Sequence, residues 1–137
     1  MSQYMLLLHA ETVDEAEQSA REAELPLFAE LHKSLREAGL LVAVQPLRSV
    51  ESATSIRVRD NETEIIDGPF AMTKEHLVGY YILECADLDE ALKQAARLPM
   101  APWSTIEVRP IMPAAEWLET ARRAGVELAD EDVSRLA

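Results

Sequence analysis

Cysteine is almost missing from this sequence, since Cys85 is the only one in 137 residues. A single thiol can form no disulfide within the chain and cannot build a four-thiolate zinc site, so a reducing compartment is expected. Basic residues are also scarce: 13 lysines and arginines stand against 25 acidic residues, which gives a net charge of -12. This charge repels phosphate backbones and anionic membrane surfaces, so nucleic acid is not expected as a direct partner.

Long hydrophobic runs and cofactor motifs are missing as well. The apolar run at residues 4–8 is too short for a membrane span, and no basic residues precede it as in a signal peptide. We therefore expect no membrane association and a cytoplasmic location. The sequence contains no GxGxxG, P-loop or GxSxG element, and its three histidines show no close metal-ligand spacing. We expect no metal and no other cofactor.

What is present is a hydrophobic content of 48% in a chain of one-domain length, enough for an ordinary core. Apolar or alternating stretches predict strands, and amphipathic stretches predict helices between them. The order is strand, helix, strand, strand, helix, strand, with a hairpin inserted before the third strand. This is the split βαβ order of an α+β, ferredoxin-like domain over residues 1–113. Residues 114–137 are expected to be a C-terminal helical extension. The predicted strands are residues 3–10, 40–45, 77–84 and 105–111, with the hairpin at 54–59 and 63–66.

Local signals set the boundaries of these elements. Thr12 and Glu15 have capping-box spacing and predict a first helix with a weakly apolar face. Pro26 restarts the helix, whose inward residues are expected to be Phe28, Leu31, Leu35 and Ala38. A second capping box, Asp87 with Glu90, opens the clearest helix of the chain. The hairpin is expected to turn at Asp60-Asn61.

The central strands are apolar on both faces, although two helices can cover only one face of a sheet. The residues at 4–8, 40–44 and 77–83 show this pattern. We therefore expect a homodimer in which the second face packs against the same face of another copy. The competing interpretation is that the helix at 114–124 folds back over its own sheet, for which Trp117 and Leu118 are the only large apolar residues.

The motif Asp67-Gly68-Pro69-Phe70, followed by Thr73-Lys74-Glu75 and Gly79-Tyr80, resembles the signature of the YCII-related family in its DGPF-motif branch. The resemblance extends from about residue 3 to residue 112. It implies a dimeric α/β barrel, and it implies little about function. Many members are encoded beside sigma factors of the extracytoplasmic-function type. A stress-response or regulatory setting is thus implied by gene context alone. The fold hosts oxygenases, isomerases and binding modules alike.

Two positions depart from the family pattern. Met72 stands where the DGPF branch usually carries a glutamate. Phe28 stands where related YCII proteins carry a proposed active-site histidine, and the nearest histidine is His32, one helical turn on. From the pattern alone, His32 is interpreted as a helix-surface residue and His76 as a loop residue.

The candidate site is the barrel cleft between two copies, where apolar walls and a few polar groups make a default small-molecule site. Asp67 is the candidate general base, and His9 is a candidate proton shuttle at the end of the first strand. The other candidate ligand-binding residues are Tyr4, Arg57, Phe70, Lys74, Tyr80 and Arg109, with Tyr81 beside them.

Each of these residues also has a structural interpretation. Asp67 can cap the Gly-Pro turn through backbone amides, and Lys74 can pair with Glu75 in solvent. The strand arginines can pair with Glu64 and Glu107 across the sheet. His9 can be a satisfied structural histidine.

Two functions of different classes follow. The first is a small-molecule site in the dimer cleft, with cofactor-free acid/base chemistry if the protein is an enzyme. The alternative is a non-catalytic accessory or regulatory protein, recognised by a partner protein through its acidic helical surface and C-terminal tail.

Overall fold

The computed structural model describes residues 1–129 and 132 of the chain. Its central layer is an antiparallel sheet of four strands in the order β2-β5-β1-β6. The α+β class is confirmed, and the strand order is consistent with a ferredoxin-like fold. The strands are β1 Ser2–Ala10, β2 Leu41–Pro46, β5 His76–Cys85 and β6 Thr105–Pro110.

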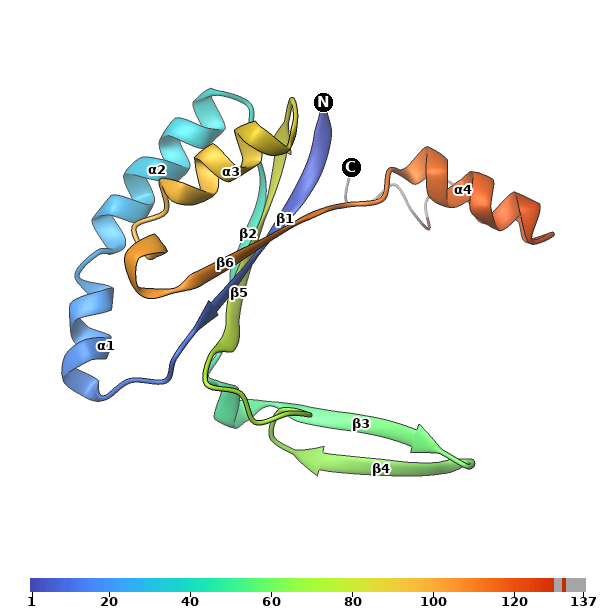
Figure 1. Cartoon of the computed structure of the whole chain (residues 1–137), viewed down its shortest axis with the longest axis horizontal. Helices are drawn as coiled ribbons and strands as arrows, with labels where there is room; N and C mark the ends of the chain where they lie inside the picture. Colours follow the sequence, from blue (N-terminus) through green and yellow to red (C-terminus); the bar gives the residue numbers. More distant parts are fainter. Residues whose placement is uncertain (130–131, 133–137) are drawn as a thin grey trace.

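Helices α2 (Leu25–Glu37) and α3 (Leu88–Ala96) lie over one face of this sheet (Figure 1). The predicted capping box opens α3, because the backbone amide of Glu90 donates to the Asp87 carboxylate at 2.9 Å. Helix α2 ends before Gly39, whose φ of +73° suits glycine. Both helices bury one narrow face, which is why they pack flat on the sheet.

The hydrophobic core lies between the sheet and these two helices. Along β1, Tyr4, Leu6 and Leu8 are each at most 8% exposed. Tyr81 and Leu83 of β5 lie directly across from Leu6 and Tyr4 and point to the same face. Helices α2 and α3 close the layer from above with Leu31, Leu35, Ala91 and Ala95.

The opposite face of the sheet, which we call the open face, has no helix of the described residues over it (Figure 1). Met5 and Leu7 alternate with the core residues of β1 and are half-buried. The centre of the open face is therefore apolar and its margins are polar. The residues on it are Met5, Leu7, His9, Tyr80, Ile82, Glu107 and Arg109.

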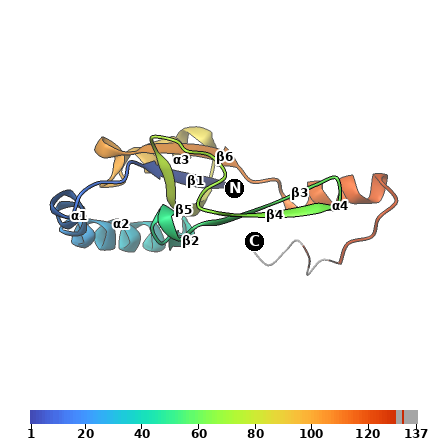
Figure 2. The ribbon, with the colours of Figure 1, turned by 90° about the horizontal axis from the view of Figure 1, so that it is seen from below.

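Two segments project from the sheet on the side away from α2 and α3: a hairpin and a helix (Figures 1 and 2). The hairpin pairs β3 (Thr54–Arg59) with β4 (Glu62–Asp67) and turns at Asp60 and Asn61, as predicted. Both turn residues have positive φ, which a tight two-residue turn requires. Helix α4 (Ala114–Arg123) extends away from its own sheet, so the fold-back arrangement is not the one observed.

Helix α1 (Glu15–Glu22) differs most from the expectation. It begins after Asp14, not Thr12, because the Asp14 carboxylate accepts the Glu17 amide at 2.9 Å and caps more strongly than a hydroxyl. The expected apolar face stays unburied, since no residue of α1 is buried. Ala38, expected to face inward from α2, is also exposed. Short 3-10 turns occupy Val50–Ser52 (η1) and Ala101–Trp103 (η2).

Candidate functional site

A cavity of about 610 Å³ lies on the helix side of the sheet, between α1, α2, η2 and the ends of β1, β2 and β5. We call it the helix-side cavity. Its volume falls in the range of about 300–1,000 Å³ that is typical of small-molecule sites. Most of the lining is apolar and includes Leu8, Phe28, Val44, Val78, Met100 and Trp103. The ionisable residues in the lining are Glu11, Arg21, Glu22, His32, Arg48, His76 and Tyr81.

The most distinctive polar feature of this cavity is the pair formed by His32 and Tyr81. The His32 Nε2 and the Tyr81 hydroxyl oxygen lie 2.6 Å apart, and the two rings meet edge-on with centroids 5.4 Å apart. Tyr81 is only 2% exposed, so this bond satisfies a hydroxyl that water barely reaches. The Phe28 ring also lies edge-on to the imidazole, with 6.3 Å between the ring centroids. The imidazole is thus held in one orientation.

Burial sets the protonation state of both groups. The pKa of His32 is lowered from 6.5, first by burial and then by the positive charge of Arg36. Burial raises the pKa of Tyr81 to about 12. Near neutral pH, His32 is therefore a neutral imidazole and Tyr81 a neutral phenol. A neutral imidazole fixed at the wall of an apolar cavity can accept a proton from a ligand.

Polar contacts hold α1 against the cavity. The Arg21 guanidinium carbon lies 4.0 Å from the centre of the Trp103 ring, and Arg21 Nη1 donates to the Glu11 carbonyl oxygen at 3.1 Å. The Trp103 indole N–H donates to the Glu24 carboxylate at 3.2 Å. Because α1 buries no side chain, this group of residues, which we call the Arg21–Trp103 cluster, accounts for its position.

Of the candidate residues predicted from the sequence, Tyr81 lines the helix-side cavity and the others lie elsewhere. Tyr4 is buried in the core, and Tyr80 and Arg109 lie on the open face. His9 also lies there, with its Nε2 3.3 Å from a Glu107 carboxylate oxygen. None of these residues lines the helix-side cavity.

Two of the predicted candidates, Lys74 and His9, do share a hollow. Both border a second hollow of about 570 Å³, with Glu11, Thr73, Glu75 and Thr105. The Lys74 ammonium lies 3.3 Å from a Glu11 carboxylate oxygen, not against Glu75 as expected. Glu75 instead accepts from the Thr105 hydroxyl at 2.8 Å.

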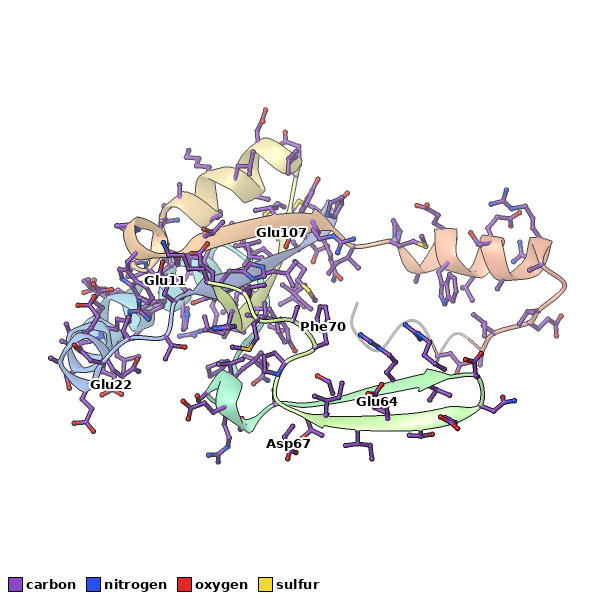
Figure 3. The ribbon with its side chains drawn as sticks, turned by 60° about the horizontal axis from the view of Figure 1, so that its bottom comes forward. Glu11, Glu22, Glu64, Asp67, Phe70 and Glu107 are labelled. Atoms are coloured by element: carbon purple, nitrogen blue, oxygen red, sulfur yellow. The ribbon has the colours of Figure 1, made fainter. Side chains whose placement is uncertain are left out.

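The remaining candidates lie on or beside the hairpin. Arg57 stands directly across from Glu64, and Asp67 ends β4 (Figure 3). Among the described residues no hydrogen bond involves the Asp67 carboxylate. The turn is held instead by the Gly68 amide, which donates to the Ala53 carbonyl at 2.7 Å. Phe70 is 81% exposed. None of Arg57, Asp67 and Phe70 lines the helix-side cavity or the second hollow.

Sequence reasoning missed both histidines of the helix-side cavity. His32 is partly buried, and His76 begins β5. A signal for His32 was available: it lies four residues after Phe28 and three before Leu35, on the flank of the inward face of α2. No local pattern indicates His76, since its position depends on how β5 meets β1.

The model of the YCII-related domain matches residues 3–117 of this chain. The chain belongs to the YCII-related family. One relative, the "Uncharacterized protein R00369" of Rhizobium meliloti (strain 1021), is 48% identical over 77 residues. That match covers 55% of this chain and 62% of the relative. The family match ends inside α4, so it includes the whole sheet, the hairpin and both cavities of this YCII-related chain.

Two further observations on the YCII-related chain concern metal binding and membrane spanning. Within residues 1–129 and 132, no three His, Cys, Asp or Glu side chains gather as metal ligands would. No helix in the same part of the chain has the length and apolarity to cross a membrane.

Proposed function

We propose that this YCII-related protein binds a small organic molecule in the helix-side cavity, where His32 serves as an acid/base group without a cofactor. The observation that carries the proposal is a neutral imidazole, fixed 2.6 Å from a buried tyrosine hydroxyl, at the wall of an apolar cavity of about 610 Å³.

The chemistry follows from the two ring nitrogens of His32. In the tautomer that carries its proton on Nε2, this nitrogen donates to the Tyr81 oxygen. Nδ1 then has a free lone pair and can accept a proton from an acidic C–H or O–H group of the ligand. Tyr81 acts as a positioning residue, because its hydroxyl holds the imidazole ring in place. The transfer creates an imidazolium and an anion, and the cations Arg21 and Arg48 in the cavity lining would stabilise that anion.

A ligand screen tests this proposal. Small organic acids, lactones, phenols and ketones are tested by thermal shift and native mass spectrometry against the wild type and three variants. We expect His32→Gln to retain the fold and bind any ligand found more weakly. Val78→Phe, which fills the cavity, should abolish binding. Lys33→Gln changes an exposed residue of the same helix, outside both candidate sites, and is the control. Ligand binding that survives both His32→Gln and Val78→Phe would rule the cavity out.

We also propose a homodimer, which is independent of the helix-side cavity. The apolar open face supports a homodimer, and the sequence-based candidates His9, Asp67 and Arg109 can share a cleft only in such a dimer. The Asp67-Gly68-Pro69-Phe70 turn, with Gly68 at a φ of +108°, supports placing the chain in the DGPF-motif branch. A cleft site of this kind predicts that Asp67→Asn removes turnover and leaves the melting temperature unchanged.

A second candidate function is supported by α4. This helix stands away from the sheet, and Trp117 on it is 43% exposed, so it offers an aromatic contact to a protein partner. The acidic tail to which the sequence analysis also pointed follows Ala124, and its residues 130, 131 and 133–137 lie outside the described residues. Deleting residues 114–137 while the core stays folded should release such a partner in a pull-down. A partner retained by the truncated chain would exclude this function.

A further inference from the structure

Arg21 has an unused pair of donors at the helix-side cavity. Its guanidinium stacks on Trp103 at 4.0 Å, and its Nη1 is occupied by the Glu11 carbonyl oxygen at 3.1 Å. Its Nε is buried and has no hydrogen-bond partner within residues 1–129 and 132. No hydrogen bond involves Nη2 within the same residues. A buried donor without an acceptor costs free energy, so a ligand that supplies the acceptor is favoured.

The free donors match one chemical group. The Nε–H and the adjacent Nη2–H leave the planar guanidinium in nearly parallel directions, which is the geometry that receives the two oxygens of a carboxylate. Arg21 is also held flat by the indole beneath it, so little freedom is lost when this edge is used. A carboxylate on the Nε and Nη2 edge would therefore supply the acceptor that the buried Nε lacks.

The charges around the cavity allow an anion in spite of the net charge of -12. The two cavity-lining glutamates have partners of their own. Glu11 lies 3.3 Å from the Lys74 ammonium, and Glu22 accepts from the Gln18 amide at 3.4 Å. Arg48 is a second cation in the lining. Arg21 and Arg48 thus have no carboxylate of the described residues within 4 Å as an ion-pair partner, and their charges face those of Glu22 and Glu24.

The rest of the lining defines the remainder of the ligand. Beyond Arg21, the cavity is walled by Leu8, Phe28, Val78 and Met100, which suit an apolar body and provide few donors. A phosphate has three acceptor oxygens and a higher charge, so it would leave acceptors unpaired here. From these observations we infer that the ligand is a small monocarboxylic acid with an aromatic or branched apolar body. This inference rests on the proposed function, since it names the ligand class of the same cavity.

Trp103 provides the readout. A carboxylate on the Nε edge of Arg21 draws the guanidinium charge away from the indole ring and changes the emission of Trp103. The chain has two tryptophans, so Trp117→Phe leaves Trp103 as the only tryptophan, which is excited at a wavelength that tyrosine does not absorb. This background is used for all fluorescence titrations, and isothermal calorimetry repeats them without a probe.

The probes are benzoate, phenylacetate, benzamide and phenyl phosphate, titrated at neutral pH. Benzoate and phenylacetate should bind saturably and change the Trp103 emission, and benzamide should bind at least about 10-fold more weakly. Arg21→Gln should weaken benzoate by about 10- to 100-fold and leave benzamide unchanged. Arg21→Lys keeps the charge but loses the paired donors, and should give an intermediate affinity. Arg123→Gln on α4 removes the same charge far from the cavity and should bind benzoate normally.

The outcomes separate the two proposals. Equal binding of benzoate and benzamide, or benzoate binding unaffected by Arg21→Gln, overturns the carboxylate inference and leaves the cavity as a ligand site. Tighter binding of phenyl phosphate than of benzoate also overturns it. Failure of every probe, together with no effect of Val78→Phe in the ligand screen, would remove the proposed function and the inference with it.

Discussion

The three histidines of this chain have three different surroundings, and each is set by the element that carries it. His9 lies on the open face beside Glu107, and His76 lines the helix-side cavity at the start of β5. His32 is bonded to Tyr81 and loses part of its hydration to the packing of α2 on the sheet. Chemistry that depends on a neutral imidazole is therefore best placed at His32.

The lowered pKa of His32 predicts a pH-dependent stability. Below pH 6.5 the unfolded chain binds a proton at this residue that the folded chain does not, so the free energy of unfolding falls as the pH drops from 6.5 to the folded pKa. Thermal melts between pH 7.5 and 5 should show this loss in the wild type and a smaller loss in His32→Gln. Proton NMR should give a His32 pKa below 6.5. Parallel curves for both proteins would contradict the prediction.

Cys85 should be inert in the folded protein. It is 0% exposed, and burial, followed by the charge of Glu90, raises the pKa of its thiol to about 11. Reaction with a thiol reagent such as Ellman's reagent should be negligible at neutral pH and complete after addition of guanidinium. Fast labelling under native conditions would mean that β5 opens locally.

At the scale of elements, β2 and β5 approach each other closely at Gly79. A Cβ atom built on Gly79 would lie 2.8 Å from the Gln45 carbonyl oxygen, which belongs to backbone and cannot swing away. Gly79→Ala should therefore lower the free energy of unfolding by about 1–3 kcal/mol, measured by urea denaturation. An unchanged midpoint would show that β2 can move away from β5 without cost.

The elements themselves were largely predictable, because their signals are local. Continuous apolar runs located three strands of the sheet, and alternation located the fourth and the hairpin. Asp60-Asn61 located the hairpin turn, and Asp87 with Glu90 located the start of α3. The course of α1 was not predictable in the same way. Its alanine-rich face suggested burial, but alanines contribute little apolar area, and the larger side chains of α2 occupy the sheet instead.

The candidate site was less predictable than the fold. The sequence places Tyr81 in the middle of an apolar strand, but the partner of its hydroxyl, His32, lies 49 residues away in the chain. The cluster of Arg21 with Trp103 likewise joins two distant segments. Such contacts depend on how α1 and η2 meet at the end of the sheet. The residue pattern within either segment does not predict this arrangement.

The whole molecule presents more apolar surface than one copy can cover. The hairpin exposes further apolar surface. Ile56 and Ile65 lie opposite each other on the two hairpin strands and are 70% and 68% exposed. A two-stranded hairpin is marginally stable by itself, so a neighbour that covers this side is favoured. We therefore expect sedimentation to give a dimer at micromolar concentration.

One variant tests this assembly at its centre. Met5→Glu places a charge in the middle of the open face and should weaken the dimer by at least about 100-fold, because the charge would be buried without a partner. Leu88→Glu, at an exposed position on the helix side, is the matched control and should remain dimeric. A wild type that sediments as a monomer would exclude the cleft between two copies and leave the helix-side cavity unaffected.

Helix α1 forms one wall of the helix-side cavity and yet takes no part in the core. Substitutions in α1 can therefore change which ligands fit the cavity while lowering the free energy of unfolding only slightly. Over evolutionary time, relatives with the same scaffold are free to diverge in ligand preference through this single segment, while the sheet beneath it stays under the tighter constraint of packing.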